Sequence, residues 1–157
     1  AFLPSLFQGH YGIETASFGW YLSVLMASYI SGTFLNQYEK DKNQWILLEP
    51  AGYVPYFSGL KTIDEVGLVD KQIQEEIKKD KVNYWINTVK NRKPKYLLSY
   101  QNLYEEKNAN AEYYKTHYKL LKEFRVKDHL ESDNKILEKI YHLKPSGTDY
   151  NLYVRVD

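Results

Sequence analysis

The sequence predicts an α/β fold: a single domain with a mixed β-sheet of about five strands, flanked by helices and ending in a C-terminal antiparallel hairpin. Short apolar runs bounded by glycine or proline alternate with segments of helical periodicity, which is typical of α/β domains. The final run alternates apolar and polar side chains, as a sheet strand does. The length of 157 residues, with 43% hydrophobic and 26% charged residues, suits one globular core.

The first predicted element is a long helix in the uncharged stretch 15–38. Phe18, Leu22, Leu25 and Tyr29 recur there at helical spacing. The stretch is long enough to cross a bilayer, but serines, glycines and a threonine dilute its apolar character. We therefore predict an amphipathic helix that packs on a sheet or rests at a membrane surface, with a transmembrane helix as the alternative.

Two short strands separated by a tight aromatic segment come next. Residues 44–49 form an apolar run closed by Pro50, and residues 61–66 form a second run broken by Gly67. Residues 51–59, which contain glycines near both ends, are predicted to form an aromatic turn or a single helical turn.

Two helices and a third strand follow. The first helix covers residues 70–79, and the second covers residues 82–92, where apolar side chains recur at i, i+3, i+4 and i+7. Pro94 ends the second helix, and residues 96–100 read as a buried strand.

The C-terminal third is predicted as a loop, a helix and the hairpin. The loop covers residues 102–110, and Asn110 is placed to cap the helix. The hairpin pairs residues 135–143 with residues 150–156, the second of which is predicted to be half-buried. The inward stripe of the predicted helix consists of Tyr113, His117, Leu120, Leu121 and Phe124.

Charge and composition exclude several function classes. The net charge of +1, from 21 basic and 20 acidic residues, gives no reason to expect nucleic acid as a partner. The chain has no cysteine, which excludes disulfides, thiolate catalysis and cysteine-ligated metal. No phosphate-loop, Gly-x-Ser-x-Gly or His-Glu-x-x-His motif is present, and no cofactor is predicted.

No metal site is predicted either. The four histidines are scattered along the chain. His129 lies near Asp128, Glu131 and Asp133, but such a run is more typical of a solvated loop than of a metal site.

The candidate substrate-binding residues are three carboxylates and two tyrosines around the first two strands. Together with the neighbouring Glu65, the carboxylates Glu49, Asp64 and Asp70 offer an acid and base pair at strand ends. The alternative is structural: Asp64 bonds a backbone turn and Asp70 caps a helix. Tyr53 and Tyr56 can stack on a sugar ring or pack beneath the turn.

Residues 49–70 resemble a pattern found in the soluble tails of bacterial multi-pass membrane glycosyltransferases of the GT-C type. These are relatives of protein mannosyltransferases, aminoarabinose transferases and mycobacterial arabinofuranosyltransferases. The pattern is a strand, Gly-x-x-x-Tyr-x-Ser/Thr-Gly, a second strand ending in Asp-x-x-Gly-Leu, and a helix. The matching positions here are Gly52, Tyr56, Ser58, Gly59, Asp64, Gly67, Leu68 and Asp70.

The resemblance implies a small α/β domain on the periplasmic or extracytoplasmic face of the inner membrane, after the last transmembrane helix. The catalytic acid of that family lies in an early loop between membrane helices, so the resemblance implies no catalytic residue in this chain. Gly52, Gly59, Gly67 and Leu68 are then structural. The implied partners are the transmembrane region of the parent protein, a glycan or lipid-linked sugar, and a nearby membrane surface.

Three functions follow as hypotheses. The first is a non-catalytic domain of a polyprenyl-phosphate-sugar-dependent membrane glycosyltransferase that positions acceptor or substrate near the membrane-embedded active site. The second is a stand-alone carbohydrate-binding or interaction module. The third is a small enzyme that uses Glu49, Asp64 and Asp70. The domain is expected over residues 16–157, with residues 1–15 as an N-terminal extension or linker of a fragment that starts without Met.

Overall fold

The computed structural model describes residues 11–49, 52–125 and 149–157. The chain divides into two compact units. One consists of residues 28–124 and 150–157 and contains the whole sheet. The other consists of residues 1–27 and 125–149, and in it Arg125 and Asp149 form an ion pair of 3.2 Å. The predicted domain boundary at residue 16 stays a prediction.

The sheet is mixed and has five strands in the order β2-β1-β3-β5-β4, which confirms the predicted fold class. Strands β1 (Trp45–Leu48), β2 (Lys61–Asp64) and β3 (Tyr96–Ser99) run parallel. Strand β5 (Tyr150–Arg155) lies antiparallel between β3 and β4 (Tyr118–Phe124). The first three strands are the ones predicted from their apolar runs, although β2 ends at Asp64 rather than at residue 66.

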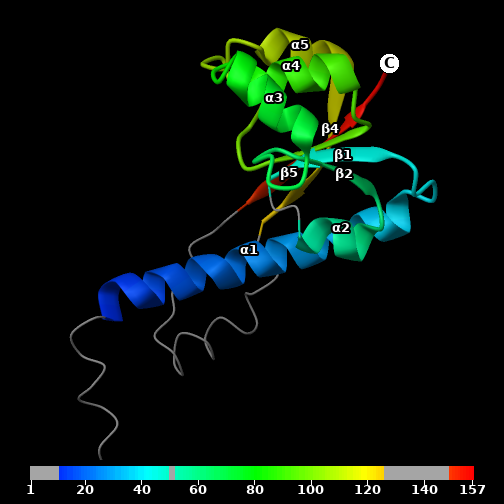
Figure 1. Ribbon diagram of the computed structural model, residues 1–157. Helices are drawn as coiled ribbons and strands as arrows, with labels where there is room; N and C mark the ends of the chain where they lie inside the picture. The colour runs from blue at the N-terminus through cyan, green and yellow to red at the C-terminus, as the bar shows by residue number, and fades with distance from the viewer. Residues whose placement is uncertain (1–10, 50–51, 126–148) are drawn as a thin grey trace, which may run out of the picture. The chain divides into compact units, whose positions relative to one another are not determined.

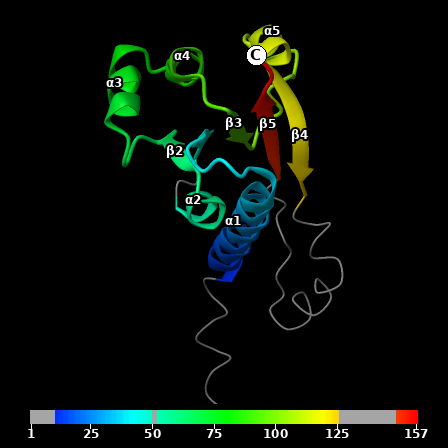
Figure 2. The ribbon, with the colours of Figure 1, turned by 90° about the vertical axis from the view of Figure 1, so that its right-hand side faces the viewer.

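Helices cover both faces of this sheet (Figures 1 and 2). The part of α1 (Tyr11–Tyr38) from Ser28 onward and α2 (Tyr53–Ser58) lie on one face. Helices α3 (Lys71–Lys79), α4 (Tyr84–Arg92) and α5 (Ala111–His117) lie on the other. Because successive side chains of a strand point to opposite faces, each buried strand supplies both cores.

The core under α3, α4 and α5 combines aliphatic and tyrosine side chains. It consists of Leu47, Ile63, Ile73, Ile86, Val89, Leu97, Leu103, Tyr114, Tyr118 and Tyr153. The opposite face buries Leu35, Ile46, Leu48, Val54, Leu98 and Leu152. The tyrosine-rich composition therefore builds much of the interior, where the hydroxyls find partners: Tyr118 donates to the Pro94 carbonyl at 2.9 Å.

Helix α1 is longer than the predicted apolar stretch and ends at a buried ionic cluster. Glu39, 8% exposed, accepts a bond of 2.7 Å from the Tyr96 hydroxyl and one of 2.5 Å from Lys95 Nζ. A buried carboxylate requires such partners. Across the ranges 11–49, 52–125 and 149–157, no helix has the length and apolar content needed to span a bilayer.

The predicted helix through residues 113–124 is wrong in its second half. Helix α5 ends at His117, and Tyr118–Phe124 is strand β4, paired with β5. Asn110 occupies the cap position without a side-chain capping bond. The antiparallel C-terminal pair is therefore β4 with β5, while residues 135–143, the predicted hairpin partner, lie outside the described residues.

The predicted half-burial of the last strand is also wrong for its first four residues. Tyr150, Asn151, Leu152 and Tyr153 are all buried. Strand β5 has a neighbour on each side, β3 and β4, and its first half is covered on both faces. Alternating exposure would need one face open to solvent.

Candidate functional site

The carboxyl ends of the three parallel strands meet at one edge of the sheet. Glu49 directly follows β1, Glu65 directly follows β2 and Tyr100 directly follows β3. Tyr150 begins the antiparallel β5 at the same edge. In open α/β sheets, ligands bind in the crevice outside the carboxyl ends of the strands, so this edge is the candidate functional site.

Glu65 is the titrating group of this edge. Burial, reinforced by the charges of Glu49 and Asp64, raises the pKa of Glu65 to about 7. Burial also raises the pKa of Tyr84 at the start of α4, and the charges of Glu65 and Glu49 add to it. Glu65 therefore exchanges a proton near neutral pH, beside the exposed Glu49 carboxylate.

A pair of tyrosines lies at the same edge of the sheet, at the end of β3 and the start of β5. The Tyr150 hydroxyl donates to the Tyr100 hydroxyl at 2.9 Å, and the two ring centroids lie 4.6 Å apart. Burial raises the pKa of Tyr100, and the hydrogen bond with Tyr150 and the charge of Glu49 add to it. Both phenols stay neutral at physiological pH and serve as hydrogen-bonding groups.

Asp64 and Asp70, two of the predicted site carboxylates, are bound to the backbone. Asp64 is 1% exposed and accepts from Val66 N at 3.1 Å and Val69 N at 2.9 Å. Asp70 is the N-cap of α3, accepting from Gln72 N and Ile73 N. Asp70 also pairs with Arg92 at 2.6 Å. These are the structural roles that the sequence offered as the alternative to acid and base chemistry.

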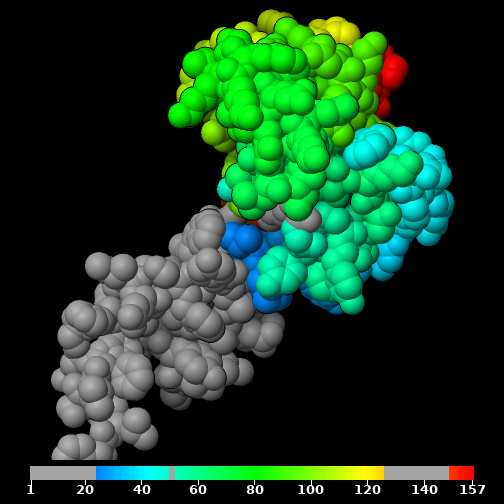
Figure 3. All heavy atoms as spheres, viewed as in Figure 1, coloured from blue at the N-terminus to red at the C-terminus, as the bar shows by residue number. Residues whose placement is uncertain are grey.

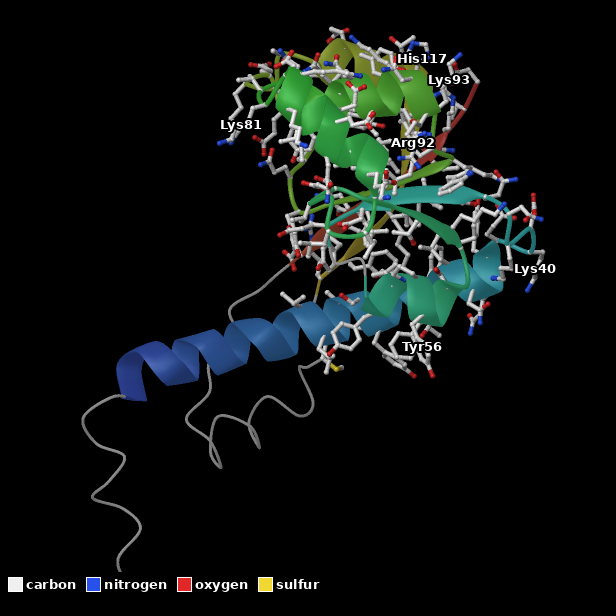
Figure 4. All side chains as sticks on the ribbon, in the orientation of Figure 1. Lys40, Tyr56, Lys81, Arg92, Lys93 and His117 are labelled. Atoms are coloured by element: carbon white, nitrogen blue, oxygen red, sulfur yellow. The ribbon has the colours of Figure 1, made fainter. Side chains whose placement is uncertain are left out.

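Tyr53 and Tyr56, the predicted sugar-stacking residues, lie on the surface of α2. Tyr53 is 50% exposed and Tyr56 is 82% exposed. Tyr56 points away from the sheet, and α2 forms part of the outer surface in the space-filling view (Figures 3 and 4). Behind them Phe57 packs edge-on against Tyr29, with ring centroids 4.9 Å apart. Core packing beneath the turn therefore does not describe Tyr53 and Tyr56.

Two of the predicted structural glycines, Gly59 and Gly67, hold backbone conformations that favour glycine, whereas Gly52 has an ordinary φ of −88°. Gly52 and Gly59 flank α2, and Gly59 and Gly67 adopt positive φ angles of 70° and 78°. Gly32 of α1 has a different role, because a Cβ there would lie 2.7 Å from Phe57 Cβ. Its missing side chain lets α2 approach α1 closely. Leu68, assigned to the same motif, is 81% exposed.

Metal binding has no support in the part of the chain that the structure describes. No group of three or more His, Asp or Glu side chains there is arranged to hold a metal ion. His117 pairs with Asp157 at 2.9 Å and packs against Tyr113, with ring centroids 4.4 Å apart. The run around His129 lies outside the described residues.

Sequence reasoning missed Tyr84, Tyr100 and Tyr150 as members of the edge. Tyr100 and Tyr150 stand at the two ends of predicted strands, so the signal was present. Their positions at strand ends identify them as members of the edge only when the strand order β1-β3-β5 is known. That order places residue 100 next to residue 150.

Fold and edge together define an α/β domain with an open mixed sheet whose parallel strands end at a polar edge that includes tyrosines. The model of one protein family, Domain of unknown function (DUF8728), matches residues 23–153. The chain therefore belongs to the DUF8728 family. No curated protein and no solved structure matches the chain.

Proposed function

We propose that this chain is a non-catalytic extracytoplasmic domain of a polyprenyl-phosphate-sugar-dependent membrane glycosyltransferase. In this role it positions acceptor or substrate near an active site that lies in the membrane-embedded part of the parent protein. The proposal starts from the resemblance of residues 49–70 to the soluble tails of GT-C enzymes, and it places the domain at the periplasmic or outer face.

One observation carries the positioning role. Within the segment that bears the resemblance, Asp64 and Asp70 are bound by backbone N–H groups, whereas Tyr53 and Tyr56 face solvent. Carboxylates that cap turns and helices maintain a shape, while exposed aromatic rings are available to a ligand. This division supports a segment that presents a surface rather than one that performs acid and base chemistry.

The edge at the carboxyl ends of the parallel strands supports the same role. Glu49 offers acceptor oxygens, Glu65 with its pKa of about 7 exchanges a proton near neutral pH, and Tyr100 is a neutral phenol. Sugar hydroxyls both donate and accept hydrogen bonds, so a surface of this kind matches a glycan better than an anionic ligand.

The test uses the intact polypeptide that contains this chain, in membranes supplied with a polyprenyl-phosphate-linked sugar and a glycan acceptor. Replacing both Tyr53 and Tyr56 by Ala should raise the KM for acceptor about thirtyfold, since each exposed ring contact contributes about 1 kcal/mol. The value of kcat should stay close to that of the wild type, because the reacting atoms are elsewhere. Val69→Ala is the matched control, since Val69 is 81% exposed on the same segment.

Two results would overturn the proposal. An intact polypeptide without a multi-pass membrane region excludes the parent enzyme. A doubly substituted enzyme with unchanged KM excludes the positioning surface.

The exposure of Tyr53 and Tyr56 also favours the second candidate, a stand-alone carbohydrate-binding module. Glycan binding by this chain that disappears in Tyr53→Ala and Tyr56→Ala, in a polypeptide without membrane spans, would select that candidate over the first.

A further inference from the structure

A cleft of about 430 Å³ lies between the start of α4 and the loop that follows β3. Its walls come from Val82, Trp85 and Ile86 on one side and from loop residues 101–110 on the other, with Tyr114 contributing from α5. The volume falls in the range of small-molecule sites, about 300–1,000 Å³. The loop directly follows β3, so the cleft belongs to the side of the sheet where the parallel strands end.

The loop that lines the cleft is held in place by bonds to the sheet. Leu103 N donates to the Tyr153 hydroxyl at 2.9 Å, and the Tyr104 hydroxyl donates to the Tyr118 carbonyl at 2.7 Å. Asn108 closes the loop internally, since its amide donates to the Leu103 carbonyl at 3.0 Å. A wall fixed in this way loses little conformational freedom when a ligand binds.

Two amide side chains of the cleft remain available. Gln101 and Asn110 line it, and neither side-chain amide bonds another residue within the described ranges. Each amide offers a carbonyl acceptor and two N–H donors. Free amides in a cleft therefore favour a ligand whose groups donate and accept together, which is the property of a hydroxyl.

The charges of the cleft cancel. Glu105 and Lys107 are its two charged lining residues, and they pair with each other at 2.7 Å. The half-buried Trp85 adds an aromatic surface, and Ile86 and Leu103 add buried apolar side chains. The cleft therefore offers no unpaired cationic side chain for a phosphate or carboxylate, and it suits a neutral ring with one apolar face.

We infer that the cleft between α4 and loop 101–110 is a binding site for a neutral saccharide. Trp85 supplies the surface for the sugar ring, and Gln101 and Asn110 bond its hydroxyls. This site is distinct from the Tyr53 and Tyr56 surface. It deepens the proposed function and rests on that function for the natural source of the saccharide.

The test is an NMR titration of the ¹⁵N-labelled 157-residue chain. The probes are methyl α-mannopyranoside, methyl β-galactopyranoside, methyl α-arabinofuranoside and N-acetylglucosamine, each up to tens of millimolar. At least one probe should shift the Trp85 indole signal and the Gln101 and Asn110 side-chain amide signals in a saturable way. Gln101→Ala and Asn110→Ala should each raise the Kd of that probe about fivefold, as expected for the loss of one hydrogen bond.

Asn91→Ala is the matched control. Asn91 is an exposed amide that lines a separate cavity of about 280 Å³ between α3 and α4, so its loss should leave the Kd unchanged. Unchanged far-UV circular dichroism in each variant shows that the fold is retained. Three results would overturn the inference: no saturable shift at Trp85 with any probe, shifts confined to Tyr53 and Tyr56, or equal shifts with diglycine as a non-saccharide probe.

The NMR titration and the transfer assay test the saccharide site and the proposed function independently. Saccharide binding in the cleft of a chain whose parent polypeptide lacks a membrane region would refute the proposed function alone. If sugar transfer depends on Tyr53 and Tyr56 but none of the four probes binds in the cleft, only the saccharide site is refuted.

Discussion

Asp70 and Arg92 join the start of α3 to the end of α4 through a carboxylate–guanidinium contact of 2.6 Å. The other carboxylate oxygen of Asp70 accepts from Gln72 N and Ile73 N in the first turn of α3. The Arg92 guanidinium in turn lies 5.3 Å from the ring centroid of Trp45 on β1. One carboxylate thus joins two helices, and its arginine partner lies over Trp45 at the amino end of β1, which accounts for an acidic residue at this place without any catalytic role.

Two substitutions of Asp70 separate its helix-capping contribution from its ion pair with Arg92. Asp70→Ala removes the cap and the ion pair and should lower the free energy of unfolding by about 1–3 kcal/mol. Asp70→Asn keeps a good capping side chain and should cost about half as much. Urea denaturation followed by circular dichroism measures both values.

Glu112→Gln is the comparison for Asp70. Glu112 also pairs with a basic side chain, Lys115, at 3.1 Å, but it is 88% exposed. Its replacement should change the free energy of unfolding by less than about 0.5 kcal/mol. Equal losses in Asp70→Ala and Asp70→Asn would contradict the capping role.

Glu65 should make the stability of the domain depend on pH near neutrality. Its pKa is about 7 in the folded protein, above the ordinary value of 4.5. A carboxyl group with a raised folded-state pKa contributes stability that is complete below pH 4.5 and is lost as the pH rises through 7. The wild-type free energy of unfolding should therefore decrease between these two pH values and somewhat beyond.

Glu65→Gln should flatten that dependence and stabilise the protein at pH 8 by about 1–2 kcal/mol, since the amide cannot ionise. Urea denaturation at pH 5, 6, 7 and 8 provides the measurement. Glu106→Gln, at an exposed loop position, should keep the wild-type profile. If Glu65→Gln and the wild type show parallel profiles, Glu65 does not titrate near pH 7.

Gly67 and Gly52 form a pair of contrasting glycines. Gly67 has a φ of 78°, and a Cβ there would lie 3.1 Å from Ile73 Cγ2. Gly67→Ala should cost about 1–3 kcal/mol, because alanine is strained at this φ and meets a buried side chain.

Gly52→Ala should instead be neutral or stabilising by up to about 1 kcal/mol. Its φ is −88°, and no atom lies within 4 Å of a Cβ built there. Thermal unfolding of both variants in one buffer provides the measurement, and a Gly52→Ala loss as large as that of Gly67→Ala would refute the backbone explanation.

The first two thirds of the fold could be predicted because its signals are local. Pro94 follows α4 closely, Asp70 caps α3, and Gly52 and Gly59 flank α2. Each of these effects acts within about one turn of chain, so the sequence carries them without knowledge of the neighbours.

The error at residues 118–124 has a different origin. A bulge between Leu120 and Lys122 shifts the pairing of β4 with β5. As a result Tyr118 packs in the core under the helices, whereas Phe124 meets Phe34 of α1 on the opposite face, with ring centroids 5.6 Å apart. The bulge removes the two-residue alternation that identifies a strand, and the remaining apolar spacing imitates a helix.

The candidate site could be predicted only in part for a similar reason. Glu49 stands at a strand end that the sequence reveals, and it does lie at the functional edge. The contact of Tyr100 with Tyr150 spans 50 residues and depends on β5 inserting between β3 and β4. The hydrophobic periodicity of one segment does not indicate which distant segment it pairs with.

The sequence by itself determined the α/β class, the caps and breaks of the first helices and strands, and the absence of cysteine chemistry. The tertiary structure alone decided which residues share the carboxyl edge, that Asp64 and Asp70 are bound to backbone while Tyr53 and Tyr56 face solvent, and that a cleft opens beside α4. The physical reason is the distance along the chain over which each interaction acts. Capping and turn formation act between near neighbours in the sequence. The burial of side chains, their shifted pKa values and the cavities between elements arise only where distant segments meet in the folded chain.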